Sequence, residues 1–368
     1  MFLTTTNLVH YLLGKGCLTL KQVIDGDCLV VDASRRNRNF KLKTGLNSGL
    51  FIKQIREYDQ TSISTMQRET ACYHMVQSPA FSTLAQIMPR FICADPDRHC
   101  LILELFANAQ NLNELQRNNQ ILPDWVGVLL GKSIGTYHQQ ITGYSFNRDE
   151  TQHFPGNLPW VFNFHQTSLQ STTPLSGGVQ QLAQLIRHQP DLQSALYQLS
   201  LCWQYNSLIH GDIKWDNCML INQAGELPQL KLIDWELVDY GDNCWDVAGV
   251  FQSFLSSWIF TMPLHQAMPI AEYLKKAGLP LEKMHSVIKS FWRSYLQSAK
   301  LNRQQARHQL LLSIRYCAAR LIQTAYEIIY HAVQLSPHAT ALLQVSQNIL
   351  IQPEAAAIEL FGFDRELS

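Results

Sequence analysis

The sequence predicts an α+β protein built of two lobes, a small one that combines a sheet with a helix and a larger one that is mainly helical. Three observations lead to this fold class. The chain has 368 residues, of which 46% are hydrophobic, which is enough for roughly two lobes. Short β-type runs are concentrated before residue 106. From about residue 124 onward, apolar residues recur at helical spacing.

The small lobe is expected to span residues 1–106 and to contain an antiparallel sheet plus a helix. Short apolar runs separated by turn-rich segments indicate its strands. The predicted elements are, in chain order, a helix at 7–22, strands at 28–31, 40–43 and 50–52, a helix at 63–76, and strands at 90–94 and 100–105.

The large lobe is expected to span residues 107–368. Apolar residues at helical spacing indicate helices in the segments 126–137 and 182–203, and a long helix is predicted over 304–334. Between the first two lies a segment at about 142–178 that is rich in Asn, Pro, Ser, Thr and Gly. A stretch of this length without regular structure is typical of a functional lid or an insert.

Composition narrows the classes of partner. Lys plus Arg and Asp plus Glu both number 29, so no excess of charge points to a nucleic acid. The apolar run at 247–264 is interrupted by polar residues and by proline, which argues against a membrane span. The nine cysteines contain no Cys-x-x-Cys, and no signal peptide is evident at the N-terminus, so we expect a cytoplasmic protein. Nothing in the sequence indicates the oligomeric state.

Two motifs carry chemistry. The first is His-Gly-Asp-Ile-Lys-Trp-Asp-Asn at 210–217, and the second is Ile-Asp-Trp-Glu at 233–236, which ends an apolar run. A kinase catalytic loop uses an Asp to accept the substrate proton and an Asn to hold a magnesium ion, while a later Asp holds the bridging magnesium. Asp212, Asn217 and Asp234 occupy those places. The sequence therefore predicts a phosphotransferase.

A third motif, Tyr-Gly-Asp-Asn-Cys-Trp-Asp-Val-Ala at 240–248, follows the other two closely. In this order the three motifs resemble those of the aminoglycoside phosphotransferase and choline kinase-like branch of the protein-kinase superfamily. The resemblance implies a bilobal protein-kinase-like fold and transfer of the γ-phosphoryl group of ATP to a hydroxyl of a small molecule. It also implies Mg²⁺ as cofactor, with GTP as an alternative donor.

The resemblance gives each residue of the catalytic segment a role. Asp212 is the expected base, and Lys214 is expected to neutralise the phosphoryl group in transit. Asn217 and Asp234 are the expected Mg²⁺ ligands, because magnesium prefers hard oxygen atoms. Structural support of the loop is expected from His210 and Asp246.

Nucleotide binding is expected in the small lobe. Lys53, at the end of a strand, and Glu69, on the following helix, fill the places of the kinase lysine–glutamate pair, although Glu57 is also available. The turn before the second strand has no glycine, and its arginines either clamp phosphates or form a solvated tip. The remaining candidates are Ser34, Arg35, Asn37 and Arg38 in this turn, and Glu104 and Phe106 at the hinge, whose backbone would bind adenine.

The acceptor is less defined. From residue 251 onward the chain has eleven Lys and Arg against seven Asp and Glu, which argues against a polycationic substrate. Two alternatives remain open beside a small-molecule kinase. Lys214 suggests a protein or peptide substrate, and the glycine-free turn suggests a pseudokinase that binds nucleotide as a scaffold. The candidates for acceptor recognition are Glu236, Arg315, Tyr316 and Arg320.

Overall fold

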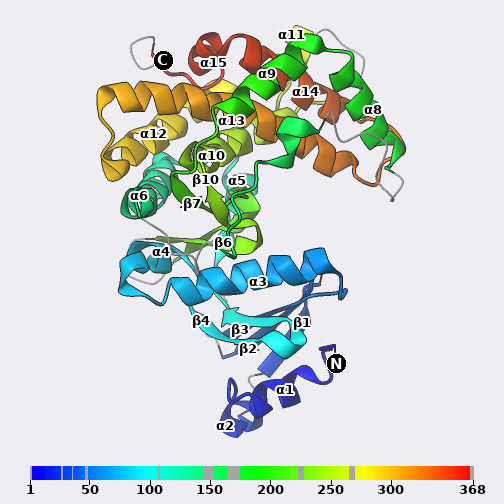
Figure 1. Cartoon of the computed structure of the whole chain (residues 1–368), viewed down its shortest axis with the longest axis vertical. Helices are drawn as coiled ribbons and strands as arrows, with labels where there is room; N and C mark the ends of the chain where they lie inside the picture. Colours follow the sequence, from blue (N-terminus) through cyan, green and yellow to red (C-terminus); the bar gives the residue numbers. More distant parts are fainter. Residues whose placement is uncertain are drawn as a thin grey trace.

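The chain folds into a small N-terminal lobe and a larger helical lobe (Figure 1). The computed structural model describes residues 2–25, 28–34, 36–45, 49–106, 108–144, 152–164, 175–222, 228–264 and 270–364. The predicted α+β class is confirmed, with an antiparallel sheet in the small lobe and helices in most of the large one.

The small lobe contains a five-stranded antiparallel sheet with the strand order β1-β2-β3-β5-β4. The helix α3 lies between this sheet and the large lobe (Figure 1). The elements are α1 (Leu8–Gly14), α2 (Leu20–Ile24), β1 (Cys28–Asp32), β2 (Arg38–Thr44), β3 (Gly49–Gln54), α3 (Gln60–Met75), α4 (Ser82–Ile87), β4 (Phe91–Asp95) and β5 (Cys100–Glu104).

The two faces of this sheet belong to different cores. Ile102 on β5 packs in a cluster with α1, whereas its neighbours Leu101 and Leu103 belong to the main core. Side chains on a strand point alternately to opposite faces, so a single strand can serve both cores. On β3 the same alternation sends Ile52 into the α1 cluster and Lys53 to the other face, toward α3.

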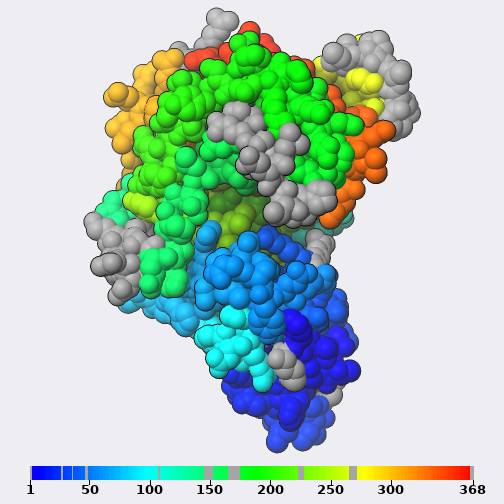
Figure 2. Space-filling view, turned by 45° about the vertical axis from the view of Figure 1, so that its right-hand side comes forward, coloured from blue at the N-terminus to red at the C-terminus, as the bar shows by residue number. Residues whose placement is uncertain are grey.

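The N-terminal helix differs from the prediction. One helix was expected over 7–22, but the structure has α1 and α2 with a break between them. The chain turns at Gly16, whose φ is +68°, a value that L-residues rarely adopt. A new helix then begins after Thr19, whose side chain accepts a hydrogen bond from the backbone N–H of Gln22. Figure 2 shows this dark-blue segment at the end of the small lobe that lies farthest from the large lobe.

The large lobe is mainly helical, with two small antiparallel sheets of order β6-β8-β9 and β10-β7. Among the described residues, no helix has both the length and the apolar character that crossing a bilayer requires. The elements are β6 (Gln110–Asn111), α5 (Leu112–Asn119), α6 (Asp124–Ile141), α8 (Gly177–Arg187), α9 (Pro190–Leu201), β7 (Ser207–Ile209), β8 (Cys218–Ile221), β9 (Gln229–Leu232), β10 (Asp239–Gly241), α10 (Asn243–Phe260), α11 (Ile270–Lys275), α12 (His285–Ala299), α13 (Arg303–Ile329), α14 (Pro337–Ile351) and α15 (Pro353–Glu359).

The predicted lid at 142–178 lies partly outside the described residues. Its described portion contains a short 3₁₀ helix, Trp160–Asn163, and the start of α8. Gly156 and Asn157, which precede this 3₁₀ helix, are attached to the segment of β10. The carboxylate of Asp239 accepts hydrogen bonds from their backbone N–H groups at 2.8 and 3.1 Å.

A row of glycines sets the contact between α6 and α12. Gly127, Gly131 and Gly135 lie four residues apart, so they share one face of α6, and this face meets the backbone of α12. A Cβ at Gly131 would lie 2.7 Å from the backbone nitrogen of Tyr295 and nearer still to the carbonyl oxygen of Phe291. The two helices therefore approach each other at backbone distance.

Gly131→Ala tests this packing. The added methyl group has no room unless α6 and α12 separate, so we expect the free energy of unfolding to fall by about 1–3 kcal/mol. Denaturant unfolding followed by circular dichroism measures the change. Gly14→Ala is the matched control, because a Cβ there meets nothing within 4 Å and should leave stability unchanged or slightly higher. Equal stability of the two variants would contradict the close packing.

Candidate active site

Lys53 is the centre of a charged cluster between the lobes. Its ammonium nitrogen lies 2.7 Å from Glu69 Oε2, 2.6 Å from Asp234 Oδ1 and 3.0 Å from Glu236 Oε2. Glu69 comes from α3, whereas the two other acids follow β9 of the large lobe. Of the two acids available to pair with Lys53, the structure selects Glu69, while Glu57 is exposed.

The protonation of this cluster follows from its charges. Burial by itself would lower the pKa of Lys53, but the carboxylates of Glu69, Asp234 and Glu236 outweigh burial and hold the pKa above its usual value. Burial raises the pKa of Glu69, and the negative charges of Asp234 and Glu236 raise it further. The positive charge of Lys53 acts to lower it but does not outweigh these effects. Three carboxylates surround one ammonium, so the cluster has an excess of negative charge and suits an added cation.

Asp234 owes its position to an unusual backbone conformation. Its φ is +66°, in the left-handed region, and a short 3₁₀ helix, Trp235–Leu237, begins directly after it. The buried Trp235 donates a hydrogen bond from its indole nitrogen to the carbonyl of Leu232 at 2.8 Å. This contact fixes the turn that aims the Asp234 carboxylate at Lys53.

Glu236 contacts Lys53, although the sequence suggested that it recognises the acceptor. It does not line the pocket beside Asp212 that is described below. It also accepts hydrogen bonds from Asn37 Nδ2 at 3.2 Å and from Arg36 at 3.4 Å. The glycine-free turn therefore reaches the charged cluster through these two side chains. The sequence had named Asn37 as a candidate, and Arg36 is one of the arginines of the turn for which phosphate binding or a solvated tip was left open.

The other predicted turn residues are placed differently. Ser34 stabilises the turn itself, because its N–H donates to Asp32 Oδ1 at 2.8 Å. Arg38 lies 4.5 Å from the centre of the Phe2 ring. It faces away from Lys53, since its neighbour Asn39 is the residue paired with Lys53 and strand side chains alternate. Arg35 lies outside the described residues.

The hinge candidates lie at the end of the sheet. The backbone N–H of Glu104 donates to the carbonyl of Arg90 at 2.9 Å, so this donor is already used within the lobe. The ring of Phe106 lies 5.9 Å from the ammonium of Lys231. That ammonium donates to the carbonyl of Gln86 at 2.6 Å, and burial lowers its pKa.

A buried carboxylate holds the candidate catalytic loop at 210–217. Asp246, at the start of α10, accepts hydrogen bonds from the backbone N–H groups of His210 at 2.8 Å and Gly211 at 3.0 Å. Tyr137 and His138 on α6 bind the same carboxylate. Burial alone would raise the pKa of Asp246, but these partners hold it below its usual value. The geometry matches the supporting role expected for Asp246.

His210 connects the two motifs. Its Nδ1 accepts from the N–H of Asp212 at 3.2 Å, and its Nε2 donates to the carbonyl of Ile233 at 3.0 Å. This pattern requires the neutral imidazole, and burial lowers the pKa of His210 accordingly. The ring therefore fixes the loop relative to Asp234 and is fully occupied by the two backbone contacts.

Asp212 is surrounded by donors. Lys214 Nζ lies 2.7 Å from Asp212 Oδ2, and Asn217 Nδ2 donates to the same oxygen at 3.1 Å. Asn217 also donates to the backbone carbonyl of Asp212 at 2.9 Å. These contacts use only the amide nitrogen of Asn217, so its Oδ1 remains as an oxygen ligand for a metal.

Two residues predicted to recognise the acceptor hold parts of the framework, and one of them, Arg320, also lines the pocket described next. The buried guanidinium of Arg320 donates to the carbonyls of Gly211 and Ile213, each at 3.0 Å, and lies 3.7 Å from Asp212. Tyr316 is buried and donates to Asp242 at 3.0 Å. Arg315, one position before it, is half-buried and does not line the pocket described next.

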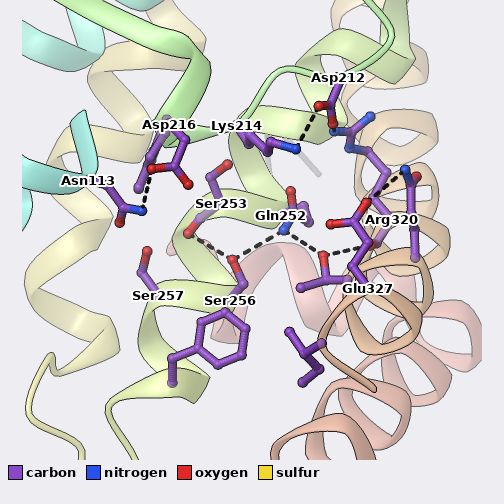
Figure 3. Close-up of a pocket in the computed structure, with 15 residues that line it drawn as sticks. Asn113, Asp212, Lys214, Asp216, Gln252, Ser253, Ser256, Ser257, Arg320 and Glu327 are labelled. Carbon is purple, nitrogen blue, oxygen red and sulfur yellow. Dashed lines mark hydrogen bonds and ion pairs between the residues drawn. The ribbon is translucent and has the colours of Figure 1, made fainter. Parts of the chain in front are cut away.

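A polar pocket of about 240 Å³ opens beside Asp212 and Lys214. In Figure 3 both residues lie above a row of side chains from α10, with Arg320 and Glu327 of α13 to one side and Asn113 with Asp216 to the other. Sequence reasoning missed this wall, because isolated Ser and Gln residues in an apolar helix carry no motif. The wall residues on α10 are Gln252, Ser253, Ser256, Ser257 and Phe260.

Comparison with known proteins supports the fold. No protein-family model matches the chain, and no curated protein matches its sequence. Among solved structures, the chain is similar to a choline kinase from Cryptosporidium parvum Iowa II, with 13% identity, a TM-score of 0.56, and 97% of this chain and 98% of that chain covered.

A second solved structure is similar over the same length. It is the ternary complex of APH(2")-IIa with streptomycin and ATP, with 12% identity and a TM-score of 0.50, and the alignment covers 95% of this chain and 99% of that chain. At identities this low, the similarity establishes the fold alone. The chain has the bilobal, protein-kinase-like fold of the choline kinase and aminoglycoside phosphotransferase structures.

Proposed function

We propose that this protein is a phosphotransferase that moves the γ-phosphoryl group of ATP to a hydroxyl group of a small metabolite or natural product. The observation that carries the proposal is the position of Asp212, which borders a polar pocket and lies on a loop tied to the Lys53 cluster through His210. One side of this arrangement supplies charges for phosphates, and the other supplies a base and room for an acceptor. GTP is an alternative donor.

The residues present fit Mg²⁺. Glu69, Asp234 and Glu236 bring carboxylate oxygens within 4.8 Å of one another around a single ammonium group. Asp234, Asn217 Oδ1 and Glu236 would hold the ion, while Glu69 keeps its pairing with Lys53. An ion held by these residues would supply positive charge to balance the negative charge that develops on the transferred phosphate.

Asp212 acts as the base of the proposed transfer. The acceptor hydroxyl lies against its carboxylate, and the hydroxyl oxygen bonds to the γ-phosphorus as the bond to ADP breaks. The proton passes to Asp212 late in this step, because the transition state is loose. Lys214, 2.7 Å from Asp212, is placed to balance the charge of the phosphoryl group in transit.

The part of the pocket wall formed by Gln252, Ser253 and Thr324 indicates the class of acceptor, because the hydrogen-bond donors of these three side chains are used inside the protein. The amide nitrogen of Gln252 donates to Ser256 at 3.2 Å and to Thr324 at 2.9 Å. Ser253 and Thr324 donate to backbone carbonyls at 2.8 and 3.0 Å. These side chains are left with oxygen lone pairs and little capacity to donate.

Oxygen atoms that can accept hydrogen bonds remain available around the cavity. Gln252 keeps its Oε1, and the carboxylates of Asp216 and Glu327 each receive a side-chain amide at one oxygen only, at 3.0 and 3.3 Å. A substrate that fills this space must itself donate hydrogen bonds to these oxygen atoms. We infer a molecule with several hydroxyl or amino groups, because a carboxylate or phosphate would meet lone pairs and negative charge.

Two other functions fit less well. The pocket of about 240 Å³ has a volume that suits a small molecule better than a protein segment, although Lys214 resembles the lysine of protein kinases. A nucleotide-binding scaffold would not need the contacts that hold Asp212. Retention of nucleotide binding without transfer to any metabolite would favour the scaffold.

Asp212→Asn separates an enzyme from a scaffold. The amide cannot take the hydroxyl proton, so we expect phosphoryl transfer to fall by about 10²–10⁴-fold while nucleotide affinity is retained. Release of ADP during incubation with a metabolite extract measures transfer, and titration with a fluorescent nucleotide measures binding. Asp191→Asn, an exposed change on α9, is the control and should leave both unchanged. Unchanged transfer in Asp212→Asn would contradict the proposed base.

Glu236→Gln tests the metal ligands. Loss of one carboxylate from the cluster should raise the Mg²⁺ concentration needed for half-maximal ADP release about tenfold or more. The exposed Glu57→Gln, which removes the same charge from the small lobe, is the matched control. If both variants kept the wild-type Mg²⁺ requirement, Glu236 would not be a ligand.

The acceptor class has its own test. Mass spectrometry of a metabolite extract before and after incubation with enzyme and ATP identifies the phosphorylated product, which should carry additional hydroxyl or amino groups. With that acceptor, Gln252→Met removes Oε1 and should raise the KM about tenfold with little change in kcat. A product derived from a carboxylate-rich or phosphate-bearing acceptor would overturn the inferred class and leave the transfer reaction intact.

A further inference from the structure

Two thiols from distant parts of the small lobe are in direct contact. The sulfur atoms of Cys17, in the turn after α1, and Cys93, on β4, lie 3.2 Å apart. Both residues are half-buried, and both belong to the cluster that packs α1 against the outer face of the sheet. They lie on the face of the sheet opposite Lys53, so the proposed transfer reaction does not use them.

The surrounding contacts hold both partners in place. The backbone N–H of Cys17 donates to the carbonyl of Leu12 at 3.0 Å, which closes the turn after α1. Lys15, two residues before Cys17, forms an ion pair with Asp95, two residues after Cys93, and 2.8 Å separates Lys15 Nζ from Asp95 Oδ2. Tyr11 on α1 donates to the same oxygen at 2.9 Å. The thiols therefore meet through a defined docking of α1 on the β4–β5 hairpin.

We propose that Cys17 and Cys93 form an oxidation site that closes into a disulfide by exchange with a small disulfide of the oxidised-glutathione class. An S–S bond is about 2.05 Å long, so the sulfurs need to approach by only about 1.2 Å. Rotation of the two side chains can bring the sulfur atoms this much closer, because Cys17 lies in a turn and both sulfurs are only part-buried.

The reaction balances as two exchanges. The Cys17 thiolate attacks one sulfur of the small disulfide, which forms a mixed disulfide and releases one thiolate. Cys93 then attacks the Cys17 sulfur and releases the second, and the two protons lost by the cysteines end on the released thiols. Burial and the neighbouring sulfur raise the pKa of Cys93 to about 12, so Cys93 is a weak nucleophile toward a disulfide in solution. It takes the second step because the Cys17 sulfur that it attacks is already in contact with it.

Other thiols are poorly suited to the same chemistry. Cys72, Cys218, Cys244 and Cys317 are buried, and burial raises the pKa of each. A buried neutral thiol is a weak nucleophile. The disulfide would fasten residues 2–24 covalently to the sheet, where polar and apolar contacts hold them in the reduced protein.

The test is oxidation of the full-length protein with oxidised glutathione, followed by proteolytic digestion without reductant and mass spectrometry. We expect a loss of two hydrogen atoms per chain and a linked peptide pair that contains Cys17 and Cys93. Dithiothreitol should reverse the change. The melting temperature of the oxidised protein should rise by roughly 2–6 °C, because the bond limits the freedom of the unfolded chain.

Single substitutions make the result specific. Cys17→Ser should abolish the linked pair, and Cys93→Ser should leave Cys17 as a stable mixed disulfide with glutathione. Cys202→Ser, which removes a half-buried thiol of the large lobe, is the control and should still give the linked pair. Absence of the link in the wild-type protein, or a link between other cysteines, would overturn the proposal. The readout needs no activity, so its failure would say nothing about phosphoryl transfer.

Discussion

One buried ammonium group joins the parts of the candidate site that come from different lobes. Lys53 is almost fully buried and contacts three carboxylates, one from α3 and two from the segment after β9. Without it these acids would repel one another in a medium of low dielectric constant. Through these contacts a single charge links α3 of the small lobe to the segment after β9 of the large lobe. The same excess of negative charge makes the cluster suitable for a cation.

The candidate catalytic loop at 210–217 is held from two sides by side chains of opposite charge. Asp246 accepts from backbone N–H groups on one side, and Arg320 donates to backbone carbonyls on the other. Donors and acceptors of the loop are therefore satisfied by side chains of opposite charge. The Asp212 carboxylate is positioned by this frame, so the pocket wall on α10 can differ in composition without moving it.

The sequence predicted the groups whose spacing is local and missed those whose partners are remote. The loop at 210–217 and the pairing of Lys53 with Glu69 follow known spacings, and short apolar runs between turn-rich segments indicated the sheet. Glu236 and Arg320 were assigned to the acceptor because an isolated charge gives no sign of its partner. Their partners, Lys53 and the carbonyl of Gly211, lie 183 and 109 residues away. Only the fold brings them together.

The glycine row on α6 has a consequence for divergence. Where helices meet through side chains, a change on one helix can be compensated by a change on the other, and their separation drifts as sequences diverge. Where backbone meets backbone, the separation is set by peptide groups that every sequence shares. Tyr137 and His138, on the same helix, bind Asp246, so the frame of the catalytic loop inherits this fixed spacing. A chain that keeps the three glycines can alter most of the surrounding core and still keep α6, with Tyr137 and His138, at the same distance from α12.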